Sequence, residues 1–309
     1  MMDSPVGPDE ACHCGSGRAY RRCCIQRDLQ EMVQQQNQAA HDDFHGLSPV
    51  QMHALLYAPF DSPRWLEFPA VLPETPDAPI AQLFEQLCQA LDAGELKATS
   101  KGNLPRAFCQ EVHRAFVGSS PYSMDRPVGK VSSEEDFEAL YVTRLVAQQA
   151  GLLRKYKGRF ILSRACKSLR DAHGMQAVYP ALLKACARRF NWGYSDGYPE
   201  YPIIQHAFAF SLYLLSRYGD TPRPRQFYED AFLRAFPMLV DEAEGDAWTS
   251  GEAKARRCYS LRTLVRFAGF MGLARLSAEL YRATGDKGMV SKTPLLDQVV
   301  CFHLQTGQG

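Results

Sequence analysis

The sequence lacks an excess of either charge, and it lacks the common catalytic motifs. Lys and Arg total 35 and Asp and Glu total 34 among 309 residues, so the net charge is +1. This balance excludes a globally basic protein, and any nucleic-acid surface has to be local. There is no phosphate-binding loop, dinucleotide glycine pattern, nucleophile elbow or zinc-protease helix. The sequence therefore favours a protein that is not an enzyme, and no small-molecule cofactor is evident.

The sequence also lacks a membrane-spanning segment and a visible secretory signal. No apolar run reaches the roughly 20 residues that a transmembrane helix requires. The N-terminus, from Met1 to Pro5, is polar and contains an acid. Hydrophobic residues make up 46% of the chain, which is enough for a folded core. We therefore expect a cytoplasmic protein with no membrane span.

Cysteine is concentrated in one short stretch. Four of the ten cysteines gather near the N-terminus, at Cys12, Cys14, Cys23 and Cys24. Four soft ligands at this spacing suit a tetrahedral Zn²⁺ ion. Gly15 and Gly17 allow the backbone to fold tightly around the metal and to direct N–H groups at the sulfurs. A pair of disulfides is the alternative, but adjacent and alternate cysteines are poor disulfide partners.

The chemistry of this cluster predicts a structural role. Four sulfur ligands leave no open coordination position, so such a site seldom catalyses. Four thiolates on one Zn²⁺ carry a formal charge of about −2. Nearby arginines can offset that charge, and we also assign them to partner binding: Arg18, Arg21 and Arg22. We expect His13 to point away from the metal, because neighbouring side chains in an extended turn diverge.

The run C-x-C-G-S-G-x-x-Y-x-x-C-C over residues 12–24 resembles the SEC-C motif. This zinc knuckle is found at the C-terminus of the bacterial preprotein translocase motor and in many uncharacterised bacterial proteins. Two positions depart from the common pattern: His13 replaces the usual Pro, and Cys24 stands where the fourth ligand is often His. The resemblance implies one structural zinc. It also implies a protein partner, because the translocase knuckle is a docking surface.

The remaining sequence predicts a mainly α protein with small β-hairpins. Apolar residues recur at helical spacing, and the clearest such segments begin at Ile25, Pro49, Pro79 and Pro105. We expect a zinc knuckle and amphipathic helix over 1–45, a helix and Pro-rich linker over 46–78, a winged-helix-like domain over 79–175 and a helical domain over 176–309.

The winged-helix expectation rests on the order of the predicted elements. Three helices are followed by a hairpin near Gly158, which is the order of a winged-helix module. The pattern Leu140, Ala147, Gly151-Leu152 and Arg154 recurs 121 residues later. The second copy contains Leu261, Ala268, Gly272, Leu273 and Arg275. This internal similarity favours a second winged-helix-like unit within 176–309.

The predicted hairpin is strongly basic. From Gly151 to Arg170 there is no Asp or Glu, and seven cations occur: Arg154, Lys155, Lys157, Arg159, Arg164, Lys167 and Arg170. Arg154, Lys155, Lys157 and Arg159 surround the expected turn, where a wing tip would meet a phosphate backbone or an acidic protein. The alternative is a solvated basic hairpin that binds nothing.

Other polar and aromatic residues have both a functional and a structural interpretation. His41 and His45 would share one face of a helix and could bind a metal, or they could mark a solvated helix end. The aromatic loop over 192–202 could stack on bases, or it could fix the loop to the core. The single histidines without an evident partner are interpreted as structural or surface residues: His113, His173 and His206.

Three functions remain open from the sequence. The first is a non-enzymatic adaptor that uses the zinc knuckle to contact a macromolecular partner. The second is a nucleic-acid-binding protein that uses a winged-helix-like unit. The third is an enzyme of unrecognised type.

Overall fold

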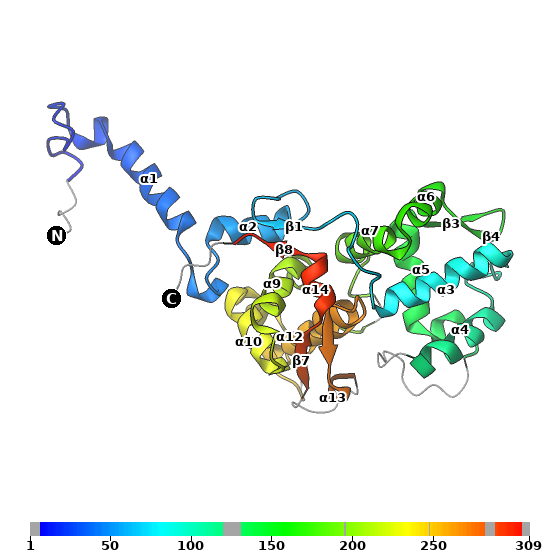
Figure 1. Cartoon of the computed structure of the whole chain (residues 1–309). Helices are drawn as coiled ribbons and strands as arrows, with labels where there is room; N and C mark the ends of the chain where they lie inside the picture. The colour runs from blue at the N-terminus through cyan, green and yellow to red at the C-terminus, as the bar shows by residue number, and fades with distance from the viewer. Residues whose placement is uncertain (1–6, 120–130, 195, 247, 282–287, 305–309) are drawn as a thin grey trace.

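The computed structural model describes residues 7–119, 131–194, 196–246, 248–281 and 288–304. These residues form a mainly helical protein with small antiparallel sheets, which confirms the expected fold class (Figure 1). No helix in these ranges is long and apolar enough to cross a membrane. One apolar core runs through the body of the molecule, from Leu47 to Val300.

The N-terminal unit stands outside this core. A cysteine-rich loop with a 3-10 turn leads directly into the first helix: η1 (Tyr20–Arg22) and α1 (Ile25–Gln38). Neither element contains a buried residue. Figure 1 shows α1 extending from the body with the cysteine-rich loop at its far end. The predicted amphipathic helix is therefore present, and its apolar residues Leu29, Met32 and Val33 are about half exposed.

The chain joins the body directly after α1. His41 and His45 do not share one face of a helix, because they flank a short 3-10 turn, η2 (Asp42–Phe44). The carbonyl of His45 accepts hydrogen bonds from Tyr213 Oη and Arg217 Nη1, each at 2.7 Å. Leu47 is fully buried. Residues 41–47 are thus held by the body.

The next segment begins with a well-capped helix. Ser48 and Gln51 form the reciprocal capping box of α2 (Pro49–Tyr57), as the Ser-Pro pair predicts. The Pro-rich linker then packs against α7 (Met175–Arg188). Pro180 has no N–H, which leaves the carbonyl of Gln176 free of its helical partner. The N–H of Leu72 donates to that carbonyl at 3.0 Å, so the linker is bound to the helix.

Three helices and a three-stranded sheet make up the first unit of the body. In chain order the elements are α3 (Pro79–Ala93), β2 (Leu96–Lys97), α4 (Arg106–Ser119), η3 (Glu134–Asp136), α5 (Glu138–Gln149), β3 (Leu153–Tyr156) and β4 (Arg159–Leu162). The strands are antiparallel in the order β2-β4-β3. Ser133 and Asp136 form a reciprocal capping box at the start of η3.

A second unit has a similar arrangement with additional helices. Its elements are α9 (Phe208–Tyr218), β5 (Arg223–Pro224), α10 (Arg225–Ala235), α11 (Met238–Glu242), α12 (Gly251–Tyr259), the π-helical η4 (Ser260–Gly269), β6 (Ala274–Leu276), α13 (Ala278–Tyr281) and β7 (Met289–Lys292). The strand order β5-β7-β6 corresponds to β2-β4-β3.

The sequence repeat marks equivalent backbone turns in the two units. Gly151 and Gly272 both have φ of +73°, a conformation that favours glycine. The following N–H groups then bond back into the helix at 2.9 and 2.8 Å, from Leu152 and from Leu273. The five sequence identities therefore coincide with a shared helix-to-strand turn.

The remaining elements connect and close the body. They are α6 (Arg164–His173), α8 (Pro202–His206), α14 (Pro294–Val299) and the two-stranded pair β1 (Leu66–Glu67) and β8 (Cys301–Phe302).

Candidate metal centre and basic hairpin

The four cysteine thiols of the N-terminal loop meet at one point. Their sulfur atoms, from Cys12, Cys14, Cys23 and Cys24, all lie within 4.8 Å of one another. Neighbouring sulfurs are 3.4 to 3.8 Å apart. Four thiolates at the usual Zn–S distance would be separated by about 3.8 Å in a tetrahedron. The cluster could therefore hold a metal ion, and it is the one group of three or more candidate ligands found among the described residues.

The backbone of the loop preorganises this cluster. Gly15 and Gly17 adopt φ of +75° and +71°, where a side chain would be strained. The N–H of Cys12 donates to the carbonyl of Arg18 at 2.9 Å, and the N–H of Gly15 donates to the carbonyl of Cys12 at 3.1 Å. The backbone of Ser16, which lies between the two glycines, stabilises the thiolate of Cys14.

Hydrogen bonds make the four thiols unequal. The side chain and the backbone of Ser16 lower the pKa of Cys14 to about 6, because they stabilise its thiolate. The pKa of Cys24 is raised to about 12, mainly because of its hydrogen bond with Cys12. Cys14 thus loses its proton easily and Cys24 keeps its proton, so a cation would favour a set in which both are thiolates.

His13 takes no part in the sulfur cluster. Its Nε2 lies 2.6 Å from Oδ2 of Asp28 on α1. Cys24 directly precedes α1, and its carbonyl accepts a hydrogen bond from the N–H of Asp28 at 2.9 Å. The loop is therefore connected to the helix both through Cys24 and through the contact between His13 and Asp28. The cysteine cluster and α1 therefore form one continuous N-terminal unit.

The arginines assigned to partner binding differ in their surroundings. Arg18 and Arg22 are exposed and make no ion pair with the described residues. Arg21 is paired with Asp9 at 3.0 Å. Two of the three predicted cations are thus unpaired next to the cysteine cluster.

The predicted basic hairpin forms between β3 and β4. Lys157 and Gly158, with φ of +47° and +73°, make a two-residue turn of the type that suits a right-twisted hairpin. Arg154, Lys155, Lys157 and Arg159 are all exposed. The Nζ of Lys157 lies 5.4 Å from the ring centroid of Tyr156, which is itself 58% exposed.

Acids from neighbouring segments neutralise part of this charge. Arg159 pairs with Glu95, and Arg170 pairs with Asp92 at 2.8 Å and with Glu85 at 3.7 Å. None of these acids is close in sequence to the hairpin. Within the described ranges, Arg154 and Lys157 have no acidic partner.

The helix that directly precedes the second strand of each unit, α5 or η4, lies inside the protein. No residue of α5 from 138 to 148 is exposed, and the same holds for η4. Inside the first unit, Arg144 and Glu134 form a buried ion pair with Nε and Oε1 2.6 Å apart. Across the units, Arg266 of η4 pairs with Glu138 of α5 at 2.7 Å. Neither helix presents a face that could enter a DNA groove.

Of the other candidate residues, Trp192 and His113 pack against aromatic side chains, whereas His173 and His206 are exposed. Trp192 is buried, stacks on Phe267 and donates to the carbonyl of Cys186 at 2.8 Å, so the aromatic loop is fixed to the core. His113 packs edge-on against Phe137. His173 is exposed at the end of α6, and His206 is exposed on α8.

The two groups of predicted partner-binding cations do not form one surface. Figure 1 places the cysteine-rich loop and the β3–β4 hairpin at opposite ends of the molecule. A single partner surface that includes Arg18, Arg22 and the hairpin is therefore not formed within one chain.

Comparison with known families gives a match over part of the chain. Residues 78–175 are similar to the family described as the Y4jL N-terminal domain. The matched range is 98 of 309 residues, starts one residue before α3 and ends where α7 begins. No curated protein and no solved structure matches the chain.

Proposed function

We propose that this protein is a non-enzymatic cytoplasmic adaptor that presents a SEC-C-like zinc knuckle on a projecting helix. The observation that carries the proposal is the closed set of four thiols at the far end of α1. Four sulfur ligands of this geometry suit one structural Zn²⁺ and leave no position for a substrate. A rigid, basic and exposed loop at the end of a helix is accessible to a macromolecular partner.

The body supports this proposal as a scaffold. Both units contain a helix, a strand, further helices and then two antiparallel strands, and we interpret both as winged-helix-like. We place the units at 79–175 and within 176–309. Because 41–47 is held by the body, we end the N-terminal unit at residue 40, and the linker segment then spans 41–78.

A pull-down with a zinc-site variant tests the adaptor. The intact protein should retain a protein partner after nuclease treatment, and Cys14→Ser should lose it because the loop no longer folds. Cys301→Ser is the matched control, since Cys301 is an exposed thiol outside the cluster. Retention of the same partner by Cys14→Ser would contradict an adaptor that acts through the knuckle.

Nucleic-acid binding is the second candidate, and the exposed hairpin tip favours it. Arg154 and Lys157 are free to contact phosphates. Because α5 is buried, we expect contacts to the phosphate backbone without readout of base edges. Fluorescence anisotropy of DNA and RNA oligomers at low salt should then show binding with little sequence preference. No binding to either at tens of micromolar protein would remove this candidate.

A further inference from the structure

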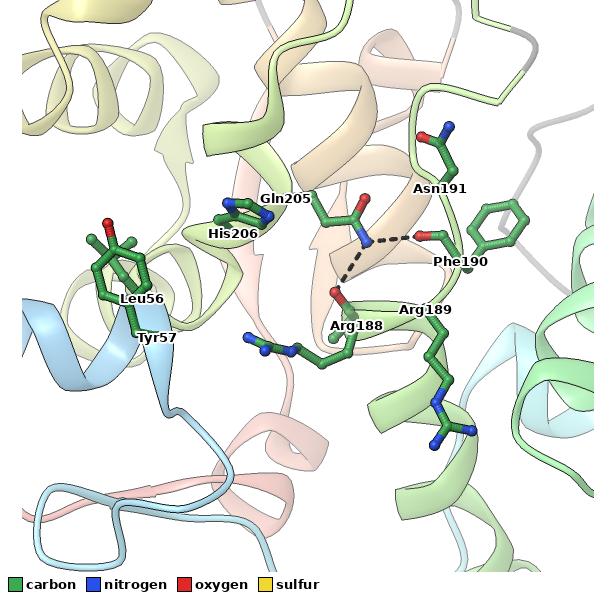
Figure 2. Close-up of a pocket in the computed structure, with 9 residues that line it drawn as sticks. Leu56, Tyr57, Arg188, Arg189, Phe190, Asn191, Gln205 and His206 are labelled. Carbon is green, nitrogen blue, oxygen red and sulfur yellow. Dashed lines mark hydrogen bonds between the residues drawn. The ribbon is translucent and has the colours of Figure 1, made fainter.

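A polar hollow lies between the C-terminal ends of α2 and α7 and the short helix α8 (Figure 2). We call it the α2–α7–α8 hollow. Its volume is about 380 Å³, which is within the range of small-molecule sites. None of the described residues that line it is acidic, and those that carry the argument are Tyr57, Arg188, Arg189, Gln205 and His206.

One wall of the hollow is fixed by Gln205. Its Nε2 donates to the carbonyls of Ala187 at 3.1 Å and of Phe190 at 2.7 Å. Its Oε1 accepts from the N–H of Trp192 at 3.2 Å. These bonds join α8 to the end of α7, so the hollow lies between firmly connected elements.

Three of the last four carbonyls of α7 have hydrogen-bond partners. The last carbonyls of a helix usually lack partners and repel anions. Here the carbonyl of Ala185 accepts two backbone N–H groups, and the carbonyl of Cys186 accepts from the indole of Trp192. With Ala187 bonded to Gln205, the helix end is compatible with an anion beside it.

Three side chains from three helices face the open space of the hollow: Tyr57 of α2, Arg188 of α7 and His206 of α8. Figure 2 shows the guanidinium of Arg188 extending toward the space between Tyr57 and His206. Neither the guanidinium of Arg188 nor the imidazole of His206 has a hydrogen-bond or ion-pair partner among the described residues. Tyr57 is 65% exposed, and its ring contacts that of His53 on its own helix at 4.8 Å between centroids.

The neighbouring arginine differs in orientation. Arg189 Nη1 donates to the carbonyl of Gln149 at 2.6 Å, and Figure 2 shows its side chain turned away from that of Arg188. Only one of the two arginines at this helix end is therefore available to a ligand in the hollow.

We propose that the α2–α7–α8 hollow binds a small phosphate monoester that carries a planar ring, such as a mononucleotide. Arg188 and His206 hold the phosphate through charge-assisted hydrogen bonds, and Tyr57 stacks on the ring. A second hollow of about 230 Å³ shares Asn191, Gln205 and His206 with the first.

Calorimetric titration of the intact protein with AMP, adenosine and inorganic phosphate tests the proposal. AMP should bind more tightly than either fragment. Arg188→Gln should weaken AMP binding about tenfold or more, because a charged hydrogen bond is lost. Tyr57→Ala should weaken AMP binding at least about fivefold and leave inorganic phosphate unchanged.

Arg189→Gln is the matched control, since it removes the same charge one residue away. It should change AMP binding by less than about twofold. Equal losses of AMP affinity in Arg188→Gln and Arg189→Gln would overturn the proposal. It would also be overturned if neither AMP at millimolar concentration nor a 5′-phosphorylated RNA pentamer bound to the protein. If the pentamer bound in an Arg188-dependent way and AMP did not bind, the small-molecule proposal would be wrong. The hollow would then bind the phosphorylated end of a nucleic acid.

Discussion

The N-terminal unit and the body of this protein are stabilised in different ways. From the cysteine-rich loop through α1, burial is confined to Cys12 and Cys24. The body has one continuous apolar core, which includes both repeated units. A loop that buries so little surface cannot gain its folding energy from the hydrophobic effect. We therefore expect the folding of the loop to depend on a metal and the folding of the body not to.

The largest expected effect is loss of the metal. Structural zinc in comparable peptides contributes an apparent binding free energy of about 10–16 kcal/mol. Cys14→Ser should therefore lose most of the zinc and unfold the loop, while the melting transition of the body stays in place. Elemental analysis and calorimetry of the same sample measure both.

His13→Ala sharpens this prediction. The imidazole contacts Asp28 and not the sulfur cluster, so this variant should keep its zinc. Equal zinc loss from His13→Ala and Cys14→Ser would show that the ligands are assigned wrongly.

A core substitution should produce the opposite pattern. Phe137 is fully buried against Phe116 and His113. Phe137→Ala should reduce the free energy of unfolding of the body by about 3–5 kcal/mol and leave the zinc content unchanged. Leu29→Ala on the exposed face of α1 is the control, and it should change the free energy of unfolding by less than about 0.5 kcal/mol. Zinc loss in the Phe137 variant would mean that loop and core fold together.

Truncation locates the border between the two regions. A chain that lacks residues 1–40 should melt cooperatively and close to the intact protein. Removal of residues 1–47 should lower the melting temperature, because the contacts of His45 and the buried Leu47 are lost. Aggregation of the shorter truncation would show that α1 or the loop is docked into the core.

Salt dependence tests whether the hairpin contacts phosphates. For duplex DNA, the log–log slope of affinity against salt is about −0.9 per contact. Replacement of Lys155 and Lys157 by Gln should flatten the slope by up to about two units. Arg159→Gln should have a smaller effect, because Glu95 already pairs with that side chain. An unchanged slope in the double variant would remove the hairpin from the interface.

The smallest effect concerns a helix cap. Backbone N–H groups of Ser132 and Ser133, each 2.8 Å from Oδ2, lower the pKa of Asp136. Because the pKa of Asp136 is lower in the folded state, its charge stabilises the protein at pH values above the unfolded pKa, which is about 3.9. This stabilisation is lost as the pH falls through the folded-state pKa. Asp136→Asn should thus melt slightly lower than the native chain at pH 7. The difference should vanish near pH 2, and a constant difference would exclude the charge as its cause.

Local signals in the sequence were sufficient for several features. The spacing of the cysteines anticipated their convergence, and the Ser48-Pro49 pair anticipated the start of α2. The turn at Gly158 anticipated the hairpin. Each of these depends on residues within about a dozen positions of one another, so the chain itself specifies them.

Features that depend on distant residues could not be predicted. Asp92 in helix α3 and Glu95 just after it pair with cations of the basic segment and so reduce its net charge. Two residues suffice for β2, which is too short for a strand pattern. The α2–α7–α8 hollow joins residues more than 130 positions apart, and no spacing in the sequence indicates it.

Hydrogen exchange of the zinc-loaded chain before and after chelation tests the difference between the two regions most directly. Chelation should abolish protection of the amides that order the loop, namely those of Cys12, Tyr20 and Cys23. Amides of α5 should keep their protection unchanged. Loss of protection in α5, or full protection of the loop without metal, would contradict a metal-folded unit that is independent of the body.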